Sequence, residues 1–176
     1  MDINRKKRNR LYVIVFIVYM VFLMYFLFFS DLFGRTVVYE DYRYNLEPFK
    51  EIRRFCTTVK EKDYIMFLIN IVGNVALFIP FGYLFSTLNE KRKRKKMISF
   101  ILMFFWTLVF CMAVETCQLV SKVGVFDIDD IILNVSGAVL GFVAYTLVRM
   151  RREACARRIY ERTPVRNPRL LREKSE

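Results

Sequence analysis

Residues 114–142 read VETCQLVSKVGVFDIDDIILNVSGAVLGF, and this stretch decides how the chain folds. Two apolar runs flank a short polar turn, and four acids lie at their borders: Glu115, Asp127, Asp129 and Asp130. An acid held at the centre of a bilayer costs roughly 2.5 to 3.5 kcal/mol on insertion scales. Because side chains this costly need a partner, water or a function, the turn and its flanks form a candidate site.

The whole chain is too apolar and too aromatic for an ordinary soluble domain. It has 55% hydrophobic residues, with 18 Phe and 10 Tyr among its 176 positions. A helix needs about 20 apolar residues to cross a hydrocarbon core about 30 Å thick. Four runs of this length cover residues 11–30, 65–88, 97–120 and 128–150. We therefore expect an all-α membrane protein, a four-transmembrane-helix bundle.

A cleavable signal peptide is the alternative for the first run, because five basic residues precede it. The apolar run is longer than the roughly 7 to 15 residues usual for such peptides. It ends in FLFFSDLFGR, at residues 26–35, which has no pair of small residues suited to cleavage. We expect a helix that is retained.

The basic residues predict the orientation of the chain. Of the 29 Lys and Arg, 21 lie in three segments: five in residues 1–10, six in residues 89–97 and ten from residue 149 onward. By the positive-inside rule these segments are cytoplasmic, so both termini are inside. The loop 31–64 and the hairpin 121–127 then face outside.

The chain thus divides into a basic N-tail (1–10), a membrane domain (11–148) and a basic C-tail (149–176). The C-tail lacks the interleaved aromatics or the fold of a nucleic-acid-binding module. Its charges are better suited to binding anionic lipid headgroups, to which each Lys or Arg contributes about 1 kcal/mol of binding free energy. We expect the lipid bilayer as partner and no nucleic acid, with the tail helical to Arg162 and irregular beyond, where Pro164 and Pro168 follow.

Several kinds of chemistry are excluded by composition. Histidine is absent, which removes Ser-His, Cys-His and histidine-metal sites, and no glycine-rich phosphate loop is present, so we expect no cofactor. Cys111 and Cys117 lie in the third run, Cys155 in the C-tail and Cys56 in the outer loop, so no outer pair is available for a disulfide.

Polar residues in the last three runs recur at helical spacing. Asn70 and Asn74 are four apart, and Glu115 and Gln118 are three apart, so each pair shares one face. The short hairpin makes the last two helices antiparallel neighbours, which brings Glu115 and Asp130 to one depth near the outer membrane boundary. The predicted ligand-binding residues are Asn74, Glu115, Gln118, Asp127, Asp130 and Asn134.

Structural roles are the alternatives for several of these positions. Gly137 and Gly141 are typical of a packing seam, and the two Asn side chains can join helices without binding any ligand. Pro80 favours a kink or a break in the second helix. Asp129 faces away from the polar stripe, so we expect it to be solvated at a helix start, where the macrodipole favours an acid.

Four motifs occur in order: YNLEPF at 44–49, NIVGNVALFIPFGYLF at 70–85, VETCQLV at 114–120 and FDIDDIILNVSGAVLGF at 126–142. Together they resemble the VanZ-like membrane proteins over residues 11–148. The positions that match the family's pattern are Asn45, Pro48, Phe49, Asn74, Pro80, Gly82, Glu115, Gln118, Asp127, Asp130, Asn134, Gly137 and Gly141.

One position departs from that pattern. Members of the family commonly have an arginine shortly before the Phe-Asp pair, where this chain has valine and glycine at 123–125. If that arginine pairs with the acids, Lys122 or Arg53 and Arg54 must substitute for it. Otherwise the acids must bind a proton, a cation or a cationic group of a ligand, because like charges at short range raise one another's pKa.

The resemblance implies a role in tolerance to glycopeptide antibiotics such as teicoplanin, or more broadly in the Gram-positive cell envelope. We favour a non-enzymatic protein whose outward site holds a lipid-linked wall precursor or an antibiotic. The alternative is an intramembrane enzyme, with Glu115 as general base and Asp127 and Asp130 holding Mg²⁺ or Ca²⁺ for hydrolysis or transfer on a lipid-linked substrate. In a third hypothesis the acids are purely structural.

Overall fold

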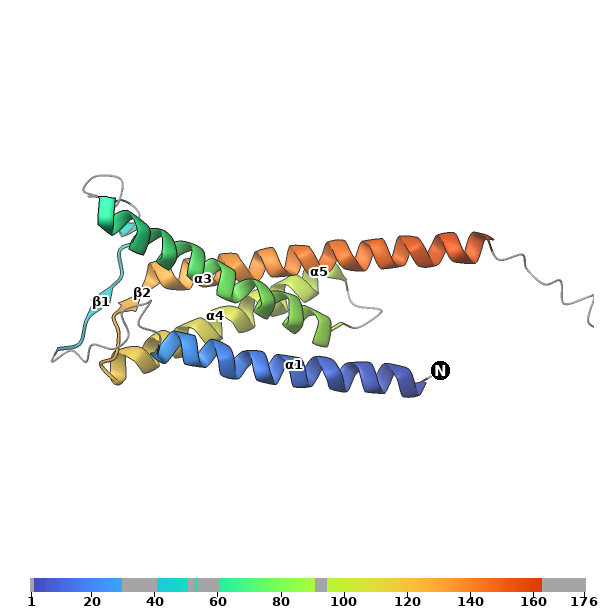
Figure 1. The fold of residues 1–176 in the computed structure, drawn as a ribbon, viewed down its shortest axis with the longest axis horizontal. Helices are drawn as coiled ribbons and strands as arrows, with labels where there is room; N and C mark the ends of the chain where they lie inside the picture. Colours follow the sequence, from blue (N-terminus) through green and yellow to red (C-terminus); the bar gives the residue numbers. More distant parts are fainter. Residues whose placement is uncertain (1, 30–40, 51–52, 54–60, 91–94, 163–176) are drawn as a thin grey trace, which may run out of the picture. The chain divides into compact units, whose positions relative to one another are not determined.

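The computed structural model describes residues 2–29, 41–50, 53, 61–90 and 95–162 (Figure 1). Cys56 and Arg54 lie outside the described residues. Four long helices dominate, and each is long and apolar enough to cross a membrane, which confirms the predicted all-α fold with four spans. The elements are α1 (Asp2–Phe29), β1 (Tyr44–Asn45), α3 (Glu61–Leu88), α4 (Lys96–Val120), β2 (Phe126–Asp127) and α5 (Ile128–Arg162).

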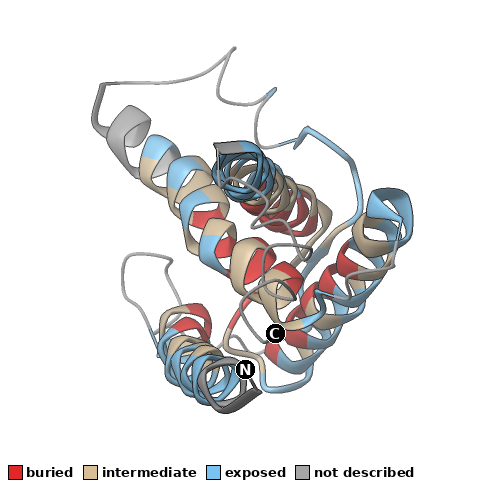
Figure 2. Ribbon diagram, turned by 90° about the vertical axis from the view of Figure 1, so that its right-hand side faces the viewer, coloured by how far each residue is buried: buried red, intermediate tan, exposed pale blue. Residues whose placement is uncertain are grey.

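Residues 1–145 form the first of two compact units, and it contains the bundle. All four helices contribute buried residues to its core, and these are coloured red on the ribbon of Figure 2. The segments that cross the membrane are helical because every backbone N–H and C=O in lipid must be hydrogen-bonded within the segment itself. The core residues are Leu23, Leu27, Phe78, Phe81, Met103, Cys111, Val114, Ile131, Val135 and Ala138.

Helix α1 is the most exposed member of the bundle and packs mainly on α3. The Tyr19 hydroxyl donates a hydrogen bond to the carbonyl oxygen of Leu77, and the rings of Phe16 and Phe81 lie 5.9 Å apart. Most remaining α1 side chains are apolar and exposed, as expected for a surface that faces acyl chains.

Helices α3 and α5 approach so closely that their backbones touch. A Cβ atom added to Gly137 or Gly141 would lie well under 3.0 Å from a carbonyl oxygen of α3. Gly82 on α3 meets the backbone of Ala138 in the same way. The two α5 glycines therefore form the packing seam that their four-residue spacing predicts.

Helix α3 continues through Pro80 to Leu88 without interruption, so the predicted alternative of a helix break at Pro80 is wrong. Proline removes only one backbone donor, and membrane helices tolerate this loss because neighbouring groups compensate. The Tyr19 hydroxyl donates to the neighbouring Leu77 carbonyl, whereas the carbonyl that loses its helical donor is that of Ala76, four residues before the proline.

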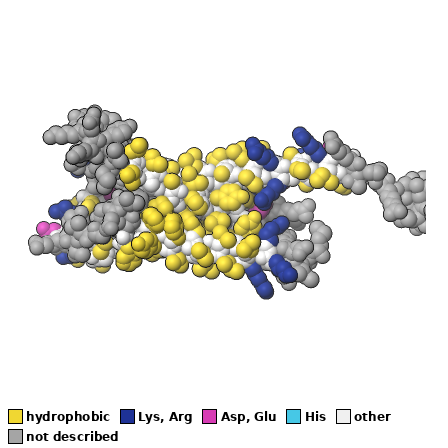
Figure 3. Space-filling view, in the orientation of Figure 1, with side chains coloured by type: hydrophobic (Ala, Val, Ile, Leu, Met, Phe, Trp, Pro, Cys, Tyr) yellow, Lys and Arg dark blue, Asp and Glu magenta, His cyan; other side chains and the backbone are white. Residues whose placement is uncertain are grey.

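The two ends of the bundle differ in character. Lys and Arg side chains gather where α1 begins, and an apolar surface covers the length of the helices (Figure 3). At the other end, here called the β end, lie the two strands and the termini of α1 and α4 (Figure 1). The Gln118 amide joins those termini by donating to the Leu27 carbonyl oxygen at 2.8 Å.

Residues 146–176 form the second compact unit, of which the structure describes the helical part that ends at Arg162. The prediction that the tail is irregular beyond Arg162 falls on residues 163–176, which lie outside the described residues. The side chains of the helical part are mostly exposed, and Arg149 Nε lies 2.9 Å from the Glu153 carboxylate.

Candidate functional site

The turn between α4 and α5 has a defined backbone geometry. Lys122 has a φ of 58°, its N–H donates to the Leu119 carbonyl at 3.1 Å, and the Val123 N–H donates to the Gln118 carbonyl at 3.2 Å. This pair of bonds is a Schellman motif, which ends a helix through one left-handed residue. The Lys122 ammonium lies 5.0 Å from the centre of the Tyr42 ring, a cation–π distance.

Asp127 caps the start of α5. Its carboxylate accepts the Asp129 N–H at 2.8 Å, which satisfies one of the free donors of the first helical turn. The Asp127 N–H in turn donates to the Glu115 carboxylate of α4 at 3.1 Å. Glu115 therefore fixes where α5 begins relative to the end of α4.

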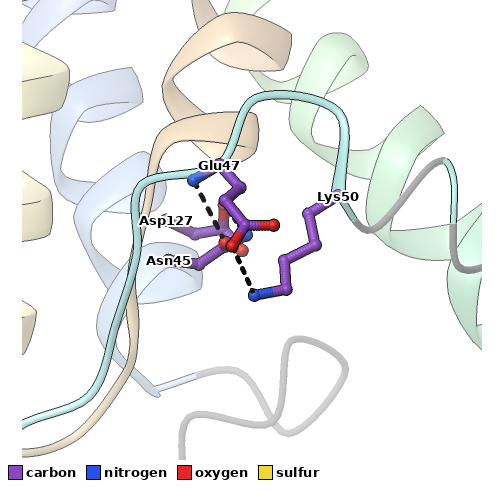
Figure 4. Close-up of polar contacts among 4 residues, drawn as sticks. All are labelled: Asn45, Glu47, Lys50 and Asp127. Atoms are coloured by element: carbon purple, nitrogen blue, oxygen red, sulfur yellow. Dashed lines mark hydrogen bonds and ion pairs between the residues drawn. The ribbon is translucent and has the colours of Figure 1, made fainter.

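A loop distant in sequence is attached to the same place. Strands β1 and β2 pair in parallel, with Tyr44 opposite Phe126 and Asn45 opposite Asp127. The Asn45 amide donates to the Asp127 carboxylate at 3.1 Å, and Figure 4 shows these two side chains together beneath Glu47. The segment 41–50, here called the β1 segment, is thus anchored to the start of α5.

The prediction that Asp129 is solvated is wrong. Its side chain is only 4% exposed, and its carboxylate accepts the N–H of Phe49 at 2.5 Å. Phe49 has a φ of 62°, a conformation that is uncommon for a residue with a side chain. Helical spacing correctly turns Asp129 away from the polar stripe, but the β1 segment covers that face.

Asn74 links α3 to α5 in the interior. Its amide donates to the Asp130 carboxylate at 2.7 Å and to the Asn70 side-chain oxygen at 3.1 Å. Asn74 is 2% exposed and Asp130 8%. A charge-assisted bond in such a low-dielectric place is among the stronger hydrogen bonds available to a protein.

Gln118 and Asn134 complete the predicted set but bond to other partners. The Gln118 amide reaches α1, as described above, and the Asn134 side chain lies within hydrogen-bonding reach of the Cys111 thiol. Both are almost fully buried. In the part of the chain that the structure describes, Gln118 Oε1 and Asn134 Oδ1 have no hydrogen-bond partner.

Glu115 and Gln118 lie near the end of α4, Asp127, Asp130 and Asn134 at or near the start of α5, and Asn74 within α3, where it contacts Asp130. We call these six residues the polar cluster. Two chains of hydrogen bonds run through it, Asn45–Asp127–Glu115 and Asn70–Asn74–Asp130. Five of the six are buried, and Asp127 alone is half-buried. Their use as ligand-binding residues stays a prediction.

Asn45 and Phe49 were not predicted as site residues from helical spacing. Their strand is two residues long, too short to give an alternating pattern, and only the resemblance of YNLEPF to a family motif marked them. Within the described ranges, no group of three or more acidic or cysteine side chains could hold a metal ion.

Comparison with known proteins agrees with this architecture. The sequence pattern of the VanZ/LLP1 family matches residues 16–149. Protein VanZ of Enterococcus faecium is 38% identical over 77 residues, which are 44% of this chain and 44% of that protein. No solved structure matches the chain. With its four apolar helices, this is a multi-pass protein of the cell membrane, and the chain belongs to the VanZ/LLP1 family.

Proposed function

We propose that this protein is a non-enzymatic cell-envelope factor that gives tolerance to glycopeptides such as teicoplanin. It would do so by binding a lipid-linked wall precursor or the antibiotic at the β end. The similarity to Protein VanZ supports the general role. The observation that carries the proposal is the hydrogen-bonded polar cluster, which joins three helices and the β1 segment at one end of an otherwise apolar bundle.

The proposal needs the β end to face outside, where glycopeptides and wall precursors meet. Support comes from charge: Lys7, Arg8 and Arg10 precede or begin the first span, and Lys95 and Lys96 lie at the start of α4. These positions are at the end opposite the β end (Figure 3). Basic residues flanking spans stay on the cytoplasmic side.

Cysteine labelling in intact cells tests this orientation. In a background without other cysteines, a variant with Glu47→Cys in the β1 segment should react with a membrane-impermeant maleimide. A variant that keeps only Cys155 should react only after the cells are permeabilised. The reverse pattern would place the polar cluster at the cytoplasmic side and end the proposal.

The burial of the polar cluster supports binding over catalysis. Glu115 is 2% exposed, so a substrate could meet its carboxylate only if the residues around it moved aside. A bulky precursor would instead contact the surface that the cluster holds in place, where Asp127 and the β1 segment emerge. We therefore assign the buried members a positioning role.

Glu115 substitutions separate charge from hydrogen bonding. Glu115→Gln keeps an acceptor for the Asp127 N–H, so it should retain most teicoplanin tolerance in a susceptible Gram-positive host. Glu115→Ala removes the acceptor and frees the start of α5, and tolerance should fall to that of the empty host. Membrane insertion should be unaffected, because losing an acid makes a helix easier to insert. The minimum inhibitory concentration is measured beside the amount of membrane-inserted protein.

Glu153→Gln is the matched control, because Glu153 is an exposed acid in the second unit. It should behave as wild type. Equal tolerance in Glu115→Ala and wild type, at equal expression, would show that tolerance does not depend on Glu115, even as a positioning residue. A loss of tolerance in Glu115→Gln as complete as in Glu115→Ala would instead favour the enzyme alternative, which requires the carboxylate. Mass spectrometry of a lipid-linked precursor incubated with purified protein would then reveal turnover.

A further inference from the structure

The β1 segment exposes more apolar surface than a water-facing loop of its length normally does. The side chains of Tyr42, Tyr44 and Leu46 are 60%, 68% and 59% exposed. Neighbouring large apolar side chains exposed in this way mark a surface that contacts a partner or a membrane.

The side chains of Tyr44 and Leu46, which flank Asn45, point away from the bundle. Side chains along an extended strand point alternately to opposite sides. The Asn45 side chain points inward to the Asp127 carboxylate, so Tyr44 and Leu46, on either side of it, point away from the bundle. Tyr42 is exposed as well, and so are the charged Arg43 and Glu47. The segment therefore presents three large apolar side chains to its surroundings, with charged side chains between them.

The segment also lies at the level where the membrane ends. It pairs with β2, which α5 follows directly at Ile128, and the candidate spans end at Val120 and begin at Ile128. Tyrosine is enriched at this level of membrane proteins, because its ring is apolar and its hydroxyl remains in contact with water. The exposed apolar side chains of the β1 segment thus lie at the level where the spans end.

We propose that the β1 segment is an interfacial membrane anchor. Tyr42, Tyr44 and Leu46 lie in the boundary between headgroups and acyl chains of the leaflet at the β end, and Asn45 faces the polar cluster. The Lys122 ammonium, 5.0 Å from the Tyr42 ring centre, reaches lipid phosphates at the same level, as interfacial lysines do. A ligand of the polar cluster would then approach along the membrane surface.

Tryptophan scanning tests the anchor, since Trp106 is the only tryptophan of the chain. In a Trp106→Phe background, Tyr44→Trp and Leu46→Trp are compared with Asp41→Trp and Glu47→Trp, which replace exposed charged residues of the same segment. Each full-length variant is placed in nanodiscs of phosphatidylcholine and phosphatidylglycerol. Fluorescence quenching is measured with a spin label near the headgroup end of an acyl chain and, separately, with iodide in water.

We expect the indoles at positions 44 and 46 to be quenched several-fold more by the lipid label than those at 41 and 47, and the order to reverse with iodide. Equal quenching at all four positions would overturn the anchor. Strong iodide quenching at 44 and 46 would also overturn it, because that face would then be free for a water-soluble ligand. If Tyr44→Trp prevents folding, Leu46→Trp against Glu47→Trp gives the same comparison. The orientation of the protein in the disc does not matter, so failure here is distinct from failure of the proposed function.

Discussion

Gly141→Ala should lower the free energy of unfolding of the bundle by about 1 to 3 kcal/mol, and Gly141→Leu should prevent folding. A Cβ at this position would overlap the carbonyl oxygen of Ile79 and approach the backbone N of Tyr83. Backbone atoms of a helix cannot rotate away as a flexible side chain can, so α3 and α5 must separate. The measurement is reversible unfolding in mixed micelles, with size-exclusion chromatography to detect loss of folded protein.

Ser136→Ala is the matched control, because it places alanine on the same helix at an exposed position. The Ser136 hydroxyl donates only to the Ile132 carbonyl of its own helix, so the stability should change by no more than about 0.5 kcal/mol. If Gly141→Ala were as stable as Ser136→Ala, direct contact between the two backbones would not hold α3 and α5 together.

The glycine seam illustrates what sequence alone can predict. The spacing of Gly137 and Gly141 predicts a close helix contact, because a pair of small residues four apart forms a groove on one face. It does not identify the partner helix. The partner is α3, whose backbone at Val75, Ile79 and Gly82 contacts α5. Of these three residues, only Gly82 is small enough to indicate from the sequence that another helix packs there.

For the polar cluster too, the sequence predicts which residues share a face but not which partners they contact. Helical period predicts which polar residues share a face, and the short hairpin predicts that α4 and α5 are neighbours. The bond between Asn74 and Asp130 and the reach of Gln118 to α1 depend on how the helices are arranged around one another. One-dimensional spacing does not contain that arrangement.

The β1 segment marks the limit of sequence-based prediction in this chain. Two paired residues give no period, and the segment is held by the side chains of Asn45 and Asp127 and by the Phe49 N–H. Asp129 shows the consequence, because its predicted solvation assumed that nothing covers the start of α5. A loop that packs back on the bundle turns an expected surface acid into a buried acceptor.

Asn74→Leu should lower the free energy of unfolding by about 2 to 3 kcal/mol. The substitution leaves the Asp130 carboxylate buried without the donor that now lies 2.7 Å away. Hydrogen bonds between membrane helices contribute only about 0.6 kcal/mol on average, but a bond to a charged acceptor is worth about 1.5 to 3 kcal/mol. Unfolding in mixed micelles measures the change, and Thr116→Val, at an exposed position whose hydroxyl bonds to its own helix, is the control.

A double-mutant cycle with Asp130→Leu isolates this pair from the other contacts of Asp130. If the bond carries the effect, the loss in the double variant should be smaller than the summed losses of Asn74→Leu and Asp130→Leu by more than about 1 kcal/mol, because the second substitution no longer strands a charge. Strict additivity would contradict a direct bond between the two side chains.

Measuring teicoplanin tolerance in the same four proteins separates two roles for the pair. If tolerance follows stability across all four, the pair acts by holding α3 to α5. If the double variant regains stability without tolerance, Asp130 contributes to binding as well.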